Sequence, residues 1–389
     1  MEKNLFVLGC TAVEDSLQDE VPDEVKAFLD AGIKFWMLTG DKLETAENIG
    51  KTCALVEDTT HLERCPALPL EECCRTLREI KNEVANSKSE VALIIAGESL
   101  DYVLYDCSDN EKRLKFPDIS NSPKTEKLAT EVRELFLEIT EKCKTVICCR
   151  ATPGQKQEVV NLMKTQTGLT TLSIGDGAND VSMILEAHVG VGLYGEEGMQ
   201  AVQASDYSVG EFKFLWNLLL VHGRFNYIRQ SEMIKYFFYK NLVFTIPQFY
   251  FMFYCAFSGQ TVYDDWYITF YNLIFTAFPL LVRAVFEKDI KLPSKSDYNL
   301  SDYALVDYSN LDNNMKILRS LPQVYDIGRE NQSFRSFNFW TWVAVGVWHS
   351  LIAFFIPFSA ATNEAINSEG HAFDLWAFSI TSFTVIIFL

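Results

Sequence analysis

The feature that most constrains this chain is a change in the character of its sequence near residue 232. Up to that point polar and apolar residues are mixed, whereas long apolar stretches rich in Phe, Tyr and Trp follow it. A helix needs about 20 apolar residues to cross a bilayer. Four segments approach that length, at about 236–257, 266–286, 337–358 and 373–389, and the last is slightly short.

The two parts of the chain are therefore expected to lie in different solvents. We predict one domain in water over residues 1–232 and a transmembrane domain over residues 233–389. Buried helices of a large soluble protein are the alternative. Because the sequence begins close to a strand-like run and ends inside an apolar one, we expect both domains to be partial.

Positive charge between the apolar segments predicts their orientation. Residues 287–336 contain seven Lys and Arg, while the connections 258–265 and 359–372 contain none. Loops enriched in Lys and Arg stay on the cytosolic side of a membrane. We therefore expect an integral, multi-pass membrane protein whose long loop and first domain lie in the cytosol.

The overall charge and the cysteines exclude other classes. Most of the net charge of −18 lies before residue 233, which argues against nucleic acid as a partner. The ten Cys include no CxxC spacing, which favours reduced thiols in the cytosol over a zinc site. No His has a metal-ligating partner at helical spacing, and we interpret His188, His222, His349 and His371 as packing or surface residues.

The first domain shows the pattern of an α/β protein. Strand-like apolar runs alternate with helical patterns, which predicts a doubly wound parallel sheet. Residues 57–144 are looser and rich in Lys and Glu, and we interpret them as an insertion or cap within the domain. The predicted strands are residues 5–10, 34–38, 91–96, 145–149, 170–174 and 188–193.

An acidic turn follows one of these strands and precedes a helical pattern. In the string GDGAND, Asp176 and Asp180 stand where a parallel strand ends, which is where α/β sheets hold their ligands. Carboxylates with nearby glycines suit Mg²⁺ and a phosphoryl group. An Asx turn followed by a helix N-cap is the alternative interpretation.

Similar polar segments follow two further strands. Thr39, Gly40 and Asp41 precede a helix and form a potential phosphate cradle, although an ordinary N-cap turn has the same residues. Arg150 ends a strand, and Lys156 lies in the first helical turn behind it, where the helix dipole disfavours a cation unless an anion faces it. Together these residues predict a magnesium-dependent phosphoryl-transfer site.

These motifs carry a specific resemblance. The strings MLTGDKLETAENIG (37–50), CCRATPGQK (148–156), GDGANDVSMI (175–184) and YNLIFTA (271–277) occur in the order found in P-type ATPases of the phospholipid flippase branch. The chain resembles the carboxyl-terminal part of that family over nearly its whole length. The resemblance implies a haloacid-dehalogenase-like phosphorylation domain, with ATP and Mg²⁺ as cofactors and an aspartyl-phosphate intermediate.

The resemblance also implies residue roles. Thr39, Gly40 and Asp41 would line the nucleotide and phosphoryl site, and Arg150 would face ATP. Lys156 would pair with the transferred phosphoryl group. Asp176 and Asp180 would hold Mg²⁺, with Asn179 assisting the phosphoryl group.

Two family motifs are missing from the sequence. Neither DKTGT, which carries the phosphorylated aspartate, nor TGES, which assists dephosphorylation, occurs in it. We therefore expect that this polypeptide alone does not hydrolyse ATP. A non-catalytic truncated membrane fragment is the alternative hypothesis.

The apolar segments indicate what is transported. The first three contain no Asp or Glu, which disfavours a cation-transporting P-type ATPase. Lys240, Asn241 and Asn272 are their notable polar residues, and we assign them to head-group binding or coupling. Snorkelling of Lys240 and helix–helix bonding by Asn272 are the alternatives. The resemblance implies a phospholipid substrate moved toward the cytosolic leaflet and a small transmembrane accessory subunit.

Overall fold

The computed structural model describes residues 17–57, 59–87, 90–106, 119, 122–195, 198–286, 322–363 and 375–389. The chain divides into two compact units, Met1–Leu218 and Leu219–Leu389. The strand predicted at residues 5–10 and most of the basic loop lie outside the described residues.

A four-stranded parallel sheet forms the larger part of the first unit. Its order is β1-β4-β3-β2. Every residue of β3 and β4 is buried, which explains why these apolar runs were predictable: a parallel strand covered on both faces has no polar side. The strands are β1 (Phe35–Leu38), β2 (His61–Cys65), β3 (Val91–Ala96) and β4 (Thr145–Cys149).

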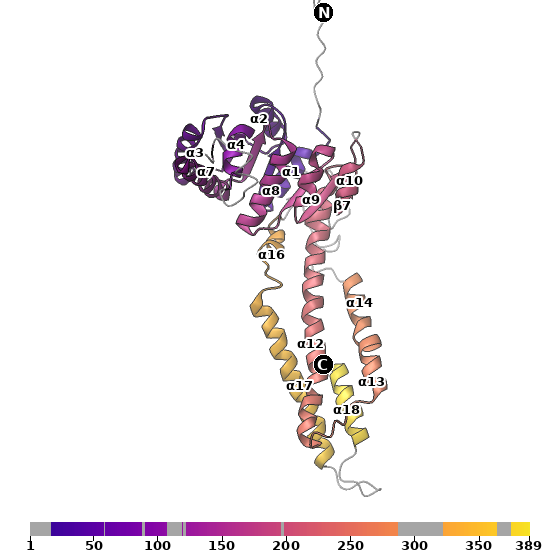
Figure 1. The fold of residues 1–389 in the computed structure, drawn as a ribbon. Coiled ribbons are helices and arrows are strands. Elements are labelled where there is room, and N and C mark those ends of the chain that lie inside the picture. Colours follow the sequence, from indigo (N-terminus) through magenta and orange to yellow (C-terminus); the bar gives the residue numbers. More distant parts are fainter. Residues whose placement is uncertain are drawn as a thin grey trace, which may run out of the picture. The chain divides into compact units, whose positions relative to one another are not determined.

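Helices cover both faces of this sheet, as the doubly wound prediction requires (Figure 1). α1 (Val21–Asp30) and α2 (Leu43–Thr52) pack on the face that carries Ile94 and Ile147. The opposite face, with Leu93 and Val146, is covered by several helices. These are α3 (Leu70–Asn86), α4 (Gly97–Leu104), α7 (Pro123–Lys142) and α8 (Pro153–Thr167). The stretch predicted as an insertion or cap therefore contributes two strands to the sheet.

A second parallel sheet, with the order β5-β6-β7, follows α8. The sequence predicted one parallel sheet; the described strands form two parallel sheets, and the strand predicted at residues 5–10 lies outside the described residues. β1 and β5 are each paired on one side only, and no described strand joins them. The elements are β5 (Leu172–Gly175), α9 (Val181–Glu186), β6 (Val189–Leu193), α10 (Gln200–Ala204) and β7 (Tyr207–Val209).

The second unit is helical. α12 (Arg224–Tyr254) packs against α17 (Ser336–Asn363), and α18 (Leu375–Phe388) adjoins α17. α13 (Asp265–Phe270) continues through a π-helical turn, η3 (Tyr271–Phe275), into α14 (Ala277–Phe286). Aromatic side chains make up most of the core between these helices, including Tyr239, Phe354 and Phe378.

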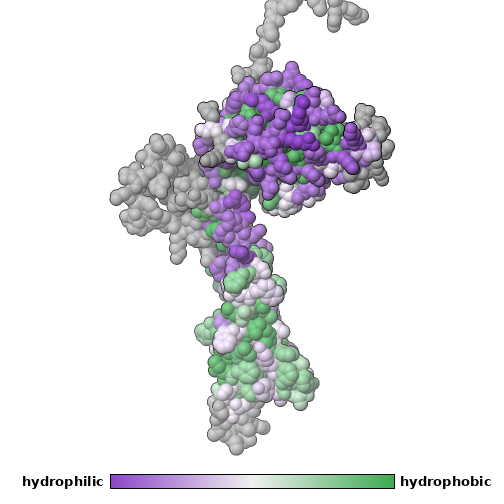
Figure 2. Space-filling model, turned by 90° about the vertical axis from the view of Figure 1, so that its left-hand side faces the viewer, coloured by the Kyte–Doolittle hydropathy of each residue, from purple (hydrophilic) through white to green (hydrophobic). Residues whose placement is uncertain are grey.

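Two helical stretches of the described residues are long and apolar enough to cross a membrane, Asp265–Phe286 and Ser336–Thr362. They correspond to the second and third predicted spans. α12 does not meet the same test, and α18 is shorter. Figure 2 shows apolar residues gathered over the helices, in contrast to the mainly hydrophilic surface of the first unit. The multi-pass topology stays a prediction.

The fully buried Leu93 of β3 provides a test of this core. We expect Leu93→Ala to lower the free energy of unfolding by about 3 kcal/mol, because truncation leaves a cavity as well as removing apolar contact. Pulse proteolysis in urea on the whole chain in detergent measures the change. Leu169→Ala, at a site 60% exposed, is the control and should change it by less than about 0.5 kcal/mol. Equal effects would contradict the assigned core.

Candidate phosphoryl-transfer site

The turn between β1 and α2 is held by its own side chains. Thr39 Oγ1 donates a hydrogen bond of 2.7 Å to Asp41 Oδ2 and accepts one of 3.1 Å from the Asp41 amide. The backbone binds the end of β4 as well: the Ala151 amide donates to the Thr39 carbonyl, and the Arg150 amide to the Asp41 carbonyl. Two of the predicted site segments therefore lie together.

Arg150 ends β4 in an unusual backbone conformation. Its φ of 52° is in the left-handed region, which non-glycine residues rarely adopt. Gly97, at the start of α4, lies so close that an added Cβ would come 2.4 Å from the Arg150 carbonyl oxygen. The Arg150 side chain is exposed and forms no hydrogen bond or ion pair with other described residues.

The N-terminus of α8 is fixed by a capping box. The Gln155 amide donates to Thr152 Oγ1, and the Thr152 amide donates to Gln155 Oε1. The buried Gln155 side chain also donates to the Gly97 carbonyl at 2.8 Å and to Asp101 Oδ1 at 2.6 Å. These bonds set the position from which the next residue, Lys156, projects.

Lys156 is paired with Asp180. Its Nζ lies 2.8 Å from Asp180 Oδ1, and the two side chains are only 13% and 15% exposed. The carboxylate is therefore the anion that faces this cation at the start of α8 and offsets its unfavourable interaction with the helix dipole. The pair also joins the segment behind β4 to the segment behind β5.

Glycines allow both carboxylates of the acidic turn to pack closely. A Cβ on Gly175 would lie 2.4 Å from the Asp180 Cβ, and one on Gly195 would lie 3.1 Å from Asp176 Oδ2. Asp176 and Asn179 are exposed, while Asp180 is partly buried. The turn thus presents one solvent-facing carboxylate beside one that Lys156 neutralises.

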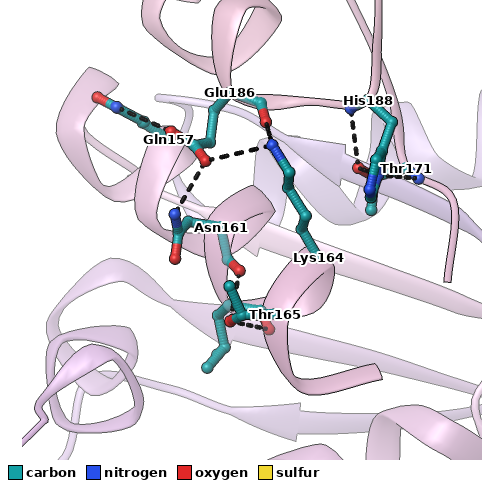
Figure 3. A network of polar contacts seen from close by, with 8 residues as sticks. Gln157, Asn161, Lys164, Thr165, Thr171, Glu186 and His188 are labelled. Atoms are coloured by element: carbon teal, nitrogen blue, oxygen red, sulfur yellow. Dashed lines mark hydrogen bonds and ion pairs between the residues drawn. The ribbon is translucent and has the colours of Figure 1, made fainter. Parts of the chain in front are cut away.

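Glu186, at the end of α9, connects this helix to α8 through hydrogen bonds (Figure 3). Its carboxylate accepts hydrogen bonds from Asn161 at 2.9 Å and Gln157 at 3.3 Å, and its carbonyl accepts one from Lys164 at 2.8 Å. This contact was not predicted from the sequence. The signal for it was a polar stripe at positions 157, 161 and 164, which share one face of a helix.

His188 has a structural role. Its Nδ1 accepts a hydrogen bond from the Thr171 amide at 3.1 Å, and its own amide donates to Thr171 Oγ1 at 3.3 Å. These bonds tie the start of β5 to β6, in agreement with its interpretation as a packing or surface residue.

In the second unit, the structure brings together two of the three notable polar residues. Lys240 is buried, and its Nζ donates to Thr276 Oγ1 at 2.9 Å and to Asn272 Oδ1 at 3.4 Å. The Tyr271 hydroxyl donates to the Lys240 carbonyl. Asn241 forms no side-chain hydrogen bond with described residues. Thr276 was missed because a threonine in an apolar helix gives no distinctive signal.

The donor set of the acidic turn fits Mg²⁺. Asp176 and Asp180 supply hard carboxylate oxygens from one turn, and Mg²⁺ commonly takes one or two carboxylates while keeping waters or phosphate oxygens in its other positions. The one described group of three or more metal-ligating side chains lies elsewhere, at His61, Glu63 and Glu83. The turn alone therefore provides part of a coordination shell.

Comparisons with known proteins agree with this geometry. The family described as "Phospholipid-translocating P-type ATPase C-terminal" matches residues 202–389. The chain is 39% identical over its whole length to "Probable phospholipid-transporting ATPase IM" of Homo sapiens, covering 31% of that protein. It is 37% identical to "Probable phospholipid-transporting ATPase 4" of Arabidopsis thaliana, covering 29%, and to "Phospholipid-transporting ATPase DRS2" of Saccharomyces cerevisiae, covering 26%.

These matches place the chain among the P-type ATPases, and its parallel α/β unit followed by apolar helices fits their carboxyl-terminal region. Within them it belongs to the phospholipid-transporting family, since the matched family and these relatives all carry that description. The chain spans about a third or less of the length of the relatives it matches.

The role of Glu186 in holding α8 against α9 is testable. We expect Glu186→Ala to speed hydrogen exchange of the α9 amides by about fivefold, because the loss of the Gln157 and Asn161 bonds destabilises this contact by about 1 kcal/mol. Exchange followed by mass spectrometry on the whole chain measures the change. Glu134→Ala, at an exposed position of α7, is the control. Unchanged α9 exchange would show that Glu186 does not hold the two helices together.

Proposed function

We propose that the chain is the carboxyl-terminal part of an ATP-driven phospholipid translocase that moves phospholipid toward the cytosolic leaflet through an aspartyl-phosphate intermediate. The observation that carries this proposal is the Lys156–Asp180 pair at the carboxyl ends of the parallel strands. Such a pair holds a cation where a transferred phosphoryl group needs charge balance.

Each site residue then has a role. Asp176 and Asp180 would hold Mg²⁺, which when bound neutralises charge on the transferring group. Lys156 donates hydrogen bonds to the phosphoryl oxygens, and Asn179 assists in holding the phosphoryl group. The following residues would line the nucleotide and phosphoryl side: Thr39, Gly40, Asp41 and Arg150.

The first unit is, in this proposal, a haloacid-dehalogenase-like phosphorylation domain. The two sheets support it, because β1 and β5 each have an unpaired edge within the described residues while the segments behind β4 and β5 are in contact. Open strand edges are normally paired or covered. A further parallel strand between them, carrying the acceptor aspartate, would complete one sheet.

The second unit supports lipid over cation as the transported substrate. The first three predicted spans lack Asp and Glu, so they offer no carboxylate for a bare cation. They do contain Lys240, hydrogen-bonded to Asn272 and Thr276, a polar group that suits an anionic head group or coupling between helices. A multi-pass topology, with the first unit in the cytosol and a small transmembrane accessory subunit, belongs to this proposal.

The catalytic part of the proposal predicts that phosphorylation needs both this chain and a preceding region that carries the acceptor aspartate. The chain alone, given ATP and Mg²⁺, should form no hydroxylamine-sensitive phosphoenzyme, because it has no DKTGT acceptor. Joined to the preceding region of the human relative, it should form one, and Lys156→Ala should lower the rate of formation by about 10²-fold or more. Lys164→Ala is the control, because Lys164 contacts Glu186 and not the acidic turn.

Radioactive phosphate retained after acid quenching measures the intermediate. Phosphorylation of the chain alone would contradict the assignment of the acceptor. An active fusion in which Lys156→Ala has no effect would contradict the role of Lys156.

The lipid part of the proposal is tested at Lys240 in the same fusion. We expect Lys240→Met to lower phospholipid-stimulated ATP hydrolysis by about tenfold, because the bonds to Asn272 and Thr276 are lost. Lys235→Met is the matched control: Lys235 is also buried in α12, but it donates to the Ser333 carbonyl. Stimulation by a cation and by no phospholipid would instead identify a cation pump.

A further inference from the structure

Three metal-ligating side chains converge on the edge strand β2, away from the phosphoryl-transfer site. His61 and Glu63 are two residues apart on β2 and so lie on one face of the strand. Helix α3 packs over that face and contributes Glu83. The ligand atoms of the three residues all lie within 4.8 Å of one another.

The distances match those between ligands that share one ion. His61 Nε2 is 2.7 Å from Glu63 Oε1 and 3.7 Å from Glu83 Oε2. Two ligands bound tetrahedrally at the usual zinc distances lie about 3.3 Å apart, between these two values.

One carboxylate oxygen of Glu63 has incomplete hydrogen bonding at this point. Its side chain is 12% exposed, and its Oε1 is buried with no hydrogen bond of acceptable geometry among the described residues, although His61 Nε2 is close. A buried carboxylate oxygen without a partner is costly. A bound cation would satisfy this oxygen directly.

The neighbouring basic residues do not supply that cation. Arg64 is paired with Glu47 at 2.8 Å, and Lys144 is paired with Glu90 at 2.7 Å. Among the described residues, Glu63 and Glu83 have no ion pair with any Lys or Arg. Two carboxylates and a neutral imidazole carry a charge of −2, which one divalent ion balances.

We propose that His61, Glu63 and Glu83 form a binding site for a divalent transition-metal ion of the Zn²⁺ type. An imidazole nitrogen with two carboxylate oxygens suits Zn²⁺, whereas Mg²⁺ and Ca²⁺ favour sites built from oxygen. His61 is 50% and Glu83 60% exposed, which leaves room for water as a fourth ligand. The ion would link the edge strand β2 to α3.

The test is Zn²⁺ binding by the whole chain, free of affinity tags, in detergent. The protein is stripped with a chelator and titrated in excess Mg²⁺, which keeps carboxylate-only sites filled, against a competing fluorescent zinc indicator. Three variants are compared with the unmodified chain: His61→Ala, Glu83→Gln and Glu79→Gln. Glu79, exposed and one turn earlier in α3, is the matched control.

We expect the unmodified chain and the Glu79→Gln variant to bind one equivalent of Zn²⁺. The His61→Ala and Glu83→Gln variants should bind this ion at least about tenfold more weakly. Because the altered side chains are half exposed, folding should be kept, which pulse proteolysis without metal verifies. Cobalt loading separates this site from the cysteines, since thiolate ligands produce an intense charge-transfer band and these ligands do not. Binding that is absent, or equally strong in all variants, would overturn the proposal.

Discussion

The contact between Lys156 and Asp180 is the interaction on which the rest of the first unit depends. A lysine at the start of a helix is unfavourable without a facing anion, and Asp180 supplies that anion from a different sheet. Both side chains are largely buried, so losing either would leave an uncompensated charge. The capping box of α8 fixes one side of the pair, and the closeness of Gly175 to Asp180 fixes the other. The segments behind β4 and β5 meet at this pair.

Sequence patterns predicted the elements that are most deeply buried. β3 and β4 were assigned correctly because parallel strands covered on both faces consist of apolar residues throughout. β2 and β7 were missed because they are edge strands whose exposed positions accept polar residues such as His61 and Tyr207. The separation into two sheets was also missed, since strand pairing is a long-range property that no local pattern encodes.

The same limit applies to the sites. Each site segment was recognisable, because a polar turn directly after an apolar strand is a local signal. Contacts between segments were not, as with Glu186 and Asn161, which are held together only by the packing of α8 on α9. Helical spacing in the sequence does not reveal the group around His61, because its two metal-ligating partners lie at strand spacing and on a separate helix. What the sequence predicts is a set of residues, and packing decides which of them touch.

The polar groups of the two units differ in a way that bears on transport. In the first unit the cation at Lys156 is balanced by a carboxylate, which fits the proposed site for a doubly charged phosphoryl group and Mg²⁺. In the second unit the Lys240 ammonium contacts neutral oxygens of Asn272 and Thr276 and the ring of Phe237, and it has no carboxylate partner among the described residues. An unbalanced cation in an apolar helix bundle repels transported cations and attracts anionic groups. This asymmetry supports the proposal that a phosphate-bearing lipid head group, and not a metal cation, approaches Lys240.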